Sequence, residues 1–69
     1  MITFNPIDYA KNFILSSQEN FIPETDKDTM KETGIMGEWN GLKVSMSRNV
    51  PRGKFLRNSN LYEIESLFK

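Results

Sequence analysis

The clearest local pattern in the chain is the stretch Ile35-Met36-Gly37-Glu38-Trp39-Asn40-Gly41-Leu42-Lys43-Val44-Ser45-Met46-Ser47, and this stretch decides the fold. The pair Asn40-Gly41 at its centre suits the two positive-φ positions of a type I′ turn, whose twist matches that of a β-hairpin. After the turn, apolar residues alternate with polar ones, which is typical of a strand with one buried face. The pattern predicts a hairpin over residues 35–47.

The residues after the hairpin predict a turn, a third strand and a final helix. Residues 49–53, Asn-Val-Pro-Arg-Gly, have the composition of a turn, and Lys54-Phe55-Leu56-Arg57 has that of a strand. Asn60 then resembles an N-cap with Glu63 three residues on, so we expect a helix over residues 61–68. A competing strand interpretation, in which apolar and acidic residues alternate from position 62 to 65, stays open.

The residues before the hairpin predict a helix and a loop. Asn5-Pro6 suits a helix start, and Ile7, Ala10 and Ile14, with Phe13 beside them, have helical spacing, so we expect a helix over residues 6–17. Residues 21–23, Phe-Ile-Pro, are a short apolar segment expected on the core. Residues 25–33 predict a loop with a helical turn, and Gly34 suits a C-terminal cap.

These elements together predict a single α+β domain over residues 1–69. Its expected arrangement is an N-terminal helix, a β-hairpin plus a third antiparallel strand, and a short C-terminal helix. A core of this size supplies only a few kcal/mol of net stability. Because the chain has no Cys and no His, disulfides and ordinary zinc sites are excluded, and a partner chain, which includes a second copy, is the expected aid.

The absent residue types also argue against catalysis. General acid–base work most often uses His, and strong nucleophiles are usually Cys or a base-activated Ser. The acidic residues Asp26, Asp28 and Glu32 do not fit an EF-hand loop, which needs an oxygen ligand where Met30 stands and a Gly where Lys31 stands. We therefore expect no enzyme activity, no metal and no cofactor.

No stretch of the sequence predicts a membrane segment or a secretory leader. The longest strictly apolar run is residues 13–15, whereas a spanning helix needs about 20 apolar residues. The first residues, Met1-Ile2-Thr3-Phe4-Asn5-Pro6, have no basic region before an apolar one. We expect a cytoplasmic protein, which for a viral protein means the host cytoplasm.

The net charge is zero, but the two halves of the chain differ in sign. Residues 1–38 carry three basic and seven acidic side chains, and residues 39–69 carry six basic and two acidic ones. The segment 43–57 has five positive charges and no negative one. Such polarity suggests a surface with a positive and a negative pole, or two halves that attract each other within the fold.

The basic segment supplies most of the candidate partner-binding residues. Trp and Arg are enriched at the energetic centres of protein interfaces. The candidates are Trp39, Lys43, Arg48, Arg52, Lys54 and Arg57. Trp39 fits either the core or an interface. The same cations could contact nucleic-acid phosphates, although the neutral chain lacks the basic excess of most nucleic-acid modules.

From residue 21 onward, the sequence resembles a segment of tailed-bacteriophage major capsid proteins. The resemblance covers residues 21–51. It is carried by the apolar segment 21–23 and by Gly34, Gly37, Gly41, Val44, Ser47, Val50 and Pro51 at matching spacing. Such capsid subunits are several times longer, so the resemblance implies a phage origin and assigns no functional residue.

The leading hypothesis is a small viral or phage-type protein, without enzyme activity, that binds and inhibits a larger host protein. The contact surface would be the hairpin 35–47 with the basic turn 48–57. One alternative is a nucleic-acid-binding accessory protein that uses residues 43–57. Another alternative is a structural component of the virion. A homodimer is compatible with each of these functions, and no membrane partner is expected.

Overall fold

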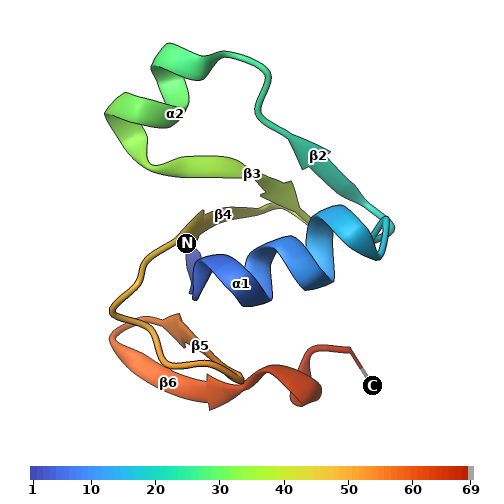
Figure 1. The fold of residues 1–69 in the computed structure, drawn as a ribbon, viewed down its shortest axis with the longest axis vertical. Coiled ribbons are helices and arrows are strands. Elements are labelled where there is room, and N and C mark those ends of the chain that lie inside the picture. The colour runs from blue at the N-terminus through green and yellow to red at the C-terminus, as the bar shows by residue number, and fades with distance from the viewer. Residues whose placement is uncertain (69) are drawn as a thin grey trace.

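The computed structural model describes residues 1–68 and has an α+β fold, in which a mixed six-stranded sheet is combined with two helices (Figure 1). The strands are β1 (Ile2–Phe4), β2 (Phe21–Pro23), β3 (Ile35–Trp39), β4 (Leu42–Met46), β5 (Lys54–Arg57) and β6 (Asn60–Glu63). The helical segments are α1 (Pro6–Tyr9), continued by the π-helical η1 (Ala10–Leu15), α2 (Lys27–Thr33) and the short 3₁₀ turn η2 (Ile64–Ser66).

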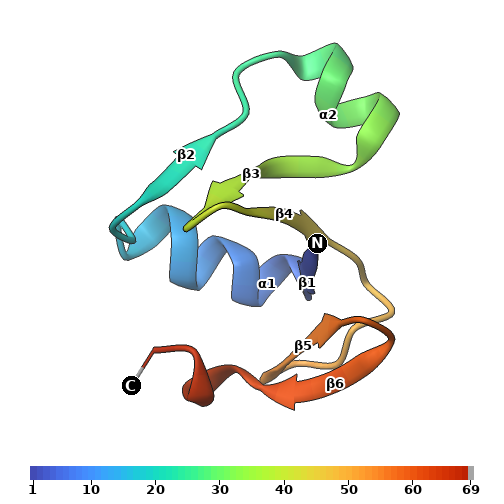
Figure 2. The same cartoon turned by 180° about the vertical axis from the view of Figure 1, so that it is seen from behind.

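The strands lie in the order β2-β3-β4-β1-β5-β6, with the first strand of the chain inside the sheet. β1 runs parallel to β4 and antiparallel to β5, and every other neighbouring pair is antiparallel. In both Figures 1 and 2, the sheet curls around α1, with β2, β3 and β4 on one side of the helix and β5 and β6 on the other. We call the face toward α1 the inner face and the opposite face the outer face.

The core fills the space between the inner face and the helix, and it is largely aromatic. Its buried residues are Ile2, Phe4, Phe13, Trp39, Val44, Phe55 and Ile64. Phe13 is the only one of them from the helix, and its ring lies 5.1 Å from that of Phe4 and 5.4 Å from that of Trp39. Tyr9 stacks on Phe13 at 5.8 Å, and burial raises the pKa of Tyr9. Phe13 therefore fixes the position of the helix on the sheet.

The first helix begins where the sequence predicts but buries a different side. The side chain of Asn5 accepts a hydrogen bond from the Ile7 backbone N–H, as expected of a cap, and the helical segment ends at residue 15 instead of 17. The expected face is wrong, because Ile7 is 59% and Ile14 is 51% exposed, whereas Asp8 and Phe13 are buried. The π-helical turns of η1 have more residues per turn than an α-helix, so the 3.6-residue spacing does not identify the side chains that face the sheet.

The predicted hairpin is confirmed. Asn40 and Gly41 have φ values of 51° and 82°, as a type I′ turn requires, and they join β3 to β4. The third strand is present as β5 with the predicted bounds, but β1 lies between it and the hairpin. Val50 of the turn before it is buried, and its carbonyl accepts a hydrogen bond from the Asn5 side chain, which ties this turn to the start of α1.

Both ends of the predicted arrangement are wrong. A strand, β1, precedes the helix, and the expected final helix over residues 61–68 is instead β6 followed by η2. The competing strand interpretation of residues 62–65 is correct for residues 62 and 63, and residues 64–66 form η2. The reason is a second tight turn, in which Asn58 and Ser59 have φ values of 51° and 66° and reverse the chain from β5 into β6.

The segment expected to be a loop with a helical turn is a seven-residue helix, α2. Asp26 caps it by accepting hydrogen bonds from the Thr29 hydroxyl and the Asp28 backbone N–H. The hydrogen bond from the Thr29 side chain, followed by those from backbone N–H groups, lowers the pKa of Asp26. Gly34 ends the helix at φ 73°, which confirms the predicted C-terminal cap.

Candidate functional site

Trp39, the first of the predicted partner-binding residues, lies in the core. It is 7% exposed, and its ring packs against Phe13 and Phe68. Its indole Nε1–H donates to the carbonyl of Glu19 at 3.1 Å, so its polar atom has a partner within the fold. The structure resolves the two alternatives for Trp39 in favour of the core.

Three of the five predicted basic residues form ion pairs within the chain. Lys43 lies 3.4 Å from a carboxylate oxygen of Glu38, and Lys54 pairs with Glu63. Arg52 Nε lies 3.0 Å from Oδ1 of Asp8. Among residues 1–68, Arg48 and Arg57 have no ion pair and are exposed.

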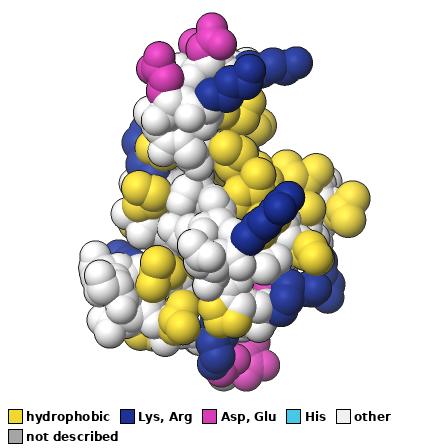
Figure 3. Space-filling model, turned by 60° about the vertical axis from the view of Figure 1, so that its left-hand side comes forward, with side chains coloured by type: hydrophobic (Ala, Val, Ile, Leu, Met, Phe, Trp, Pro, Cys, Tyr) yellow, Lys and Arg dark blue, Asp and Glu magenta, His cyan; other side chains and the backbone are white. Residues whose placement is uncertain are grey.

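The structure does not bring the basic residues together. Lys43 and Lys54 lie on β4 and β5, Arg48 and Arg52 lie in the loop between these strands, and Arg57 lies at the turn into β6. Figure 3 shows Lys and Arg side chains in separate groups on the visible face, with acidic side chains at both its top and its bottom. The predicted site is thus a set of dispersed cations instead of one continuous basic surface.

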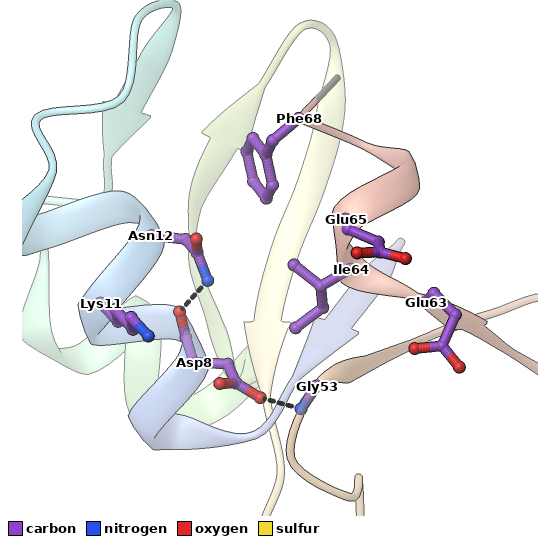
Figure 4. A pocket seen from close by; sticks show the side chains of 8 residues that line it. All are labelled: Asp8, Lys11, Asn12, Gly53, Glu63, Ile64, Glu65 and Phe68. Carbon is purple, nitrogen blue, oxygen red and sulfur yellow. Dashed lines mark hydrogen bonds between the residues drawn. The ribbon is translucent and has the colours of Figure 1, made fainter.

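A shallow pocket of about 500 Å³ lies between the first helix and the C-terminal residues (Figure 4). Figure 4 shows Lys11 on the helical side, with Glu63 and Glu65 on the opposite side. The pocket is lined by Asp8, Lys11, Asn12, Gly53, Glu63, Ile64, Glu65 and Phe68. Among the residues that the structure describes, no group of three or more acidic side chains is placed to hold a metal ion.

The buried Asp8 carboxylate beside this pocket has both oxygens occupied. Oδ2 accepts the Gly53 backbone N–H at 2.7 Å, and Oδ1 accepts Arg52 Nε at 3.0 Å. The same residue is 5% exposed. Through these two hydrogen bonds, the Asp8 carboxylate joins the helix to the turn before β5, which gives Asp8 a structural role.

Substitution of Asp8 by Asn tests how much these hydrogen bonds between the helix and the turn stabilise the fold. The change leaves one oxygen and places an NH₂ group against the Gly53 N–H or Arg52 Nε. We expect a loss of about 2 kcal/mol in the free energy of unfolding, since charge-assisted buried hydrogen bonds contribute about 1.5–3 kcal/mol each. Urea denaturation followed by Trp39 fluorescence measures the loss.

The matched control for Asp8→Asn is Arg52→Gln, which removes only the ion pair. The Arg52 side chain is 52% exposed, so its replacement should cost less than about 1 kcal/mol. An equal loss in the two variants would show that the Gly53 N–H contributes nothing.

The free edge at β6 is a different kind of site, made of backbone groups. The Ile64 N–H donates to the Gly53 carbonyl at 3.0 Å, toward the β5 side. Because backbone groups alternate along a strand, those of Asn60 and Tyr62 also face β5, where these residues pair with Arg57 and Phe55. The N–H and C=O groups of Leu61 and Glu63 therefore point away from the sheet, and the Glu63 carbonyl already accepts a hydrogen bond from the Ser66 hydroxyl at 2.7 Å.

The side chains along this edge include two large exposed hydrophobic groups. Leu61 is 50% and Tyr62 is 45% exposed, and all four residues of β6 are exposed. Tyr62 stacks on Phe55 at 5.4 Å, toward the inner face. Leu61 lies opposite Leu56, on the outer face. An added strand would therefore find apolar contacts on both faces of the sheet.

The opposite edge of the sheet is protected in a way that β6 is not. β2 has three residues, and one of them is Pro23, which has no backbone N–H to donate. β6 contains neither Pro nor Lys, the residues with which proteins commonly block an edge strand. Sequence reasoning missed this edge because residues 61–68 were expected to be helical.

Comparison of the chain with models of known protein families, with curated proteins and with solved structures found no match. Within residues 1–68, no helix is long and apolar enough to span a bilayer.

Proposed function

We propose that the chain is a protein-binding module without enzyme activity, and that it holds its partner by adding a strand to β6. The observation that carries the proposal is the unblocked edge, where the backbone groups of Leu61 and Glu63 point outward beside exposed apolar side chains. In strand addition, main-chain hydrogen bonds supply affinity, and contacts to alternate side chains supply specificity.

The proposed partner is a larger protein that offers an extended segment. A host protein that the chain inhibits would be such a partner. Pairing along β6 would satisfy the outward N–H and C=O groups of Leu61 and the outward N–H of Glu63, whose carbonyl already accepts the Ser66 hydroxyl. It would also cover Leu61, and because this side chain is already half-buried, the gain is about half of the roughly 1.5–3 kcal/mol that complete burial contributes. An inhibitor of this kind acts by occupying a segment that its target needs elsewhere, so it requires no catalytic group.

The charges of the described residues favour a protein partner over a nucleic acid. Lys43, Arg52 and Lys54 are each paired with a carboxylate, which lowers the charge available to phosphates. Affinity for nucleic acid depends on counterions released by unpaired cations, and it falls steeply as salt rises. Binding of oligonucleotides that weakens in this way would favour the alternative of a nucleic-acid accessory protein.

A structural role in a virion is the second candidate, and the capsid-like pattern favours it. The residues of that pattern have backbone and packing roles here. Gly41 lies in the hairpin turn, Gly37 has no room for a side chain, and Val44 is fully buried. Detection of the chain in purified particles, with none in the soluble fraction of infected cells, would favour this candidate.

A capture experiment with Leu61→Lys tests the protein-binding proposal. Lys on an edge strand opposes strand addition, so proteins that the native chain captures from a lysate of its source should be lost. Leu15→Lys is the matched control, because Leu15 is 80% exposed and lies on the helix, away from β6. Identical protein sets from the two variants, read by mass spectrometry, would contradict the proposal.

A further inference from the structure

The turn that joins β3 to β4 holds a chemically reactive pair of residues, which the proposed function does not use. Asn40 is followed directly by Gly41, and both residues are exposed. Asparagine is among the thermolabile residue types. We infer that Asn40 is a site of spontaneous covalent modification, in which its side-chain amide is lost as ammonia and replaced by a carboxylate, with water as the co-reactant.

The reaction is a cyclisation followed by a hydrolysis. The backbone nitrogen of Gly41 attacks Cγ of Asn40, and a bond between these two atoms forms. The side-chain nitrogen leaves as ammonia and takes the proton that the Gly41 nitrogen loses. Water then opens the resulting five-membered succinimide ring at either of its carbonyl groups. The products are aspartate and isoaspartate, and neither step oxidises or reduces any atom.

The structure leaves both reacting groups free. Within residues 1–68, neither the Asn40 side chain nor the Gly41 N–H has a hydrogen-bond partner. The strand pairing ends at Trp39 and Leu42, on either side of the turn. A Cβ added at Gly41 would meet nothing within 4 Å. Because glycine has no side chain, nothing crowds its nitrogen during the attack.

One local rotation takes the turn to the geometry that ring closure needs. Asn40 has φ 51°, and type I′ and type II′ turns share a positive φ at this first central position. The two types differ in the orientation of the peptide group between the central residues. In the type I′ form, the Gly41 nitrogen points away from the Asn40 side chain, and rotation of this peptide group toward the type II′ orientation brings it to Cγ. The pairing of Trp39 with Leu42 persists, because both types close a two-residue hairpin.

The chain contains a second tight turn that matches the first but lacks the glycine. Asn58 and Ser59 join β5 to β6 with φ values of 51° and 66°, so Asn58 has the same φ as Asn40. Ser59 places a Cβ next to the nitrogen that would attack. The remaining asparagines are followed by Pro or by a large or branched apolar residue, at positions 6, 13, 21, 50 and 61. Asn40 is therefore the asparagine expected to react first.

The modification changes the β3–β4 hairpin in two ways. Both products add a negative charge two residues from Glu38, which pairs with Lys43. Isoaspartate also adds one backbone atom to a two-residue loop, and the length of the loop is what selects the type I′ turn. Because Trp39 next to this loop is buried in the core, the isoaspartate form should unfold at a lower denaturant concentration than the native chain.

Incubation of the folded chain in mildly alkaline buffer, followed by peptide mapping with mass spectrometry, tests the inference. Asn40 should be converted before any other of the seven asparagines. Ser59→Gly is the matched variant, since glycine accepts the positive φ at position 59. It should raise the rate at Asn58 to that of Asn40 and leave the rate at Asn40 unchanged. Conversion of Asn58 as fast as that of Asn40 in the native chain, or no acceleration in Ser59→Gly, would overturn the assignment.

A denatured sample of the native chain controls for the effect of the fold. If Asn40 reacts there but stays intact in the folded chain, the turn blocks the peptide rotation, and the inference fails. Freshly purified Asn40→Asp carries the added charge without the added backbone atom, so it separates the two effects of the modification. The isoaspartate form, isolated by chromatography, should unfold at a lower urea concentration than Asn40→Asp. Equal unfolding midpoints would contradict the expected disruption of the turn.

Discussion

Phe13→Ala is expected to lower the free energy of unfolding by about 3–5 kcal/mol, which is comparable to the whole net stability of a domain this small. Phe13 is 3% exposed. Its ring contacts aromatic rings from the helix, from three strands of the sheet and from the C-terminal segment, namely Tyr9, Phe4, Phe21, Trp39 and Phe68. Its removal takes away the buried helical side chain that packs against β1, β2, β3 and Phe68.

Chemical denaturation followed by circular dichroism measures the effect of Phe13→Ala, since Trp39 fluorescence would itself change with the loss of a neighbouring ring. The matched control is Leu15→Ala, two residues along the same helical segment and 80% exposed. It should change stability by no more than about 0.5 kcal/mol. Similar losses in the two variants would show that helix propensity, and not the aromatic core, explains the result.

Local sequence patterns predicted the elements whose geometry is set by adjacent residues. Asn40-Gly41 specifies a hairpin because the turn itself selects residues that accept positive φ. β1 has no such signal, because a three-residue strand is stabilised by neighbours far along the chain. Ile2 lies beside Val44 in a parallel pair, and both residues are fully buried. Nothing near Ile2 in the sequence indicates that contact.

The errors at the helices arose from tertiary contacts that override helical periodicity. Ile7 and Ile14 have the spacing of a buried face but are exposed, since the helix instead turns Asp8 toward the Gly53 N–H and Phe13 toward the core. At the C-terminal end, the spacing of Leu61 and Ile64 is compatible with a helix. Pairing of Leu61 with Leu56 in β5 makes that segment a strand.

The candidate site was predictable only in part, because side-chain type does not reveal the pairing of charges. Arg52 was expected at an interface, yet its side chain forms an ion pair with the buried Asp8, which comes 44 residues earlier in the chain. Lys54 was expected to be available to a partner, yet it pairs with Glu63 across a hairpin that the sequence did not predict. Arg57 keeps its exposed charge and lies at the end of the hairpin that presents the free edge.

Gly37→Ala is expected to displace β2 and to cost about 3 kcal/mol, at the upper end of the usual range for overpacking. A Cβ at Gly37 would lie 2.6 Å from the Ile22 carbonyl oxygen and 2.7 Å from the ring of Phe21. The ring could turn aside, but the carbonyl belongs to the backbone of the neighbouring strand. The strands must therefore separate, and the Ile22–Glu38 and Pro23–Gly37 pairings weaken.

Amide hydrogen exchange distinguishes this steric effect from backbone strain. Gly34→Ala is the control, because Gly34 has φ 73° and nothing within 4 Å of an added Cβ, so it should cost about 1–2 kcal/mol from conformation alone. In Gly37→Ala, protection should fall along β2 and its partner β3, whereas in Gly34→Ala it should fall at the end of α2. Unchanged protection of β2 in Gly37→Ala would mean that the two strands tolerate a side chain between them, and that the glycine at position 37 is not required by their close approach.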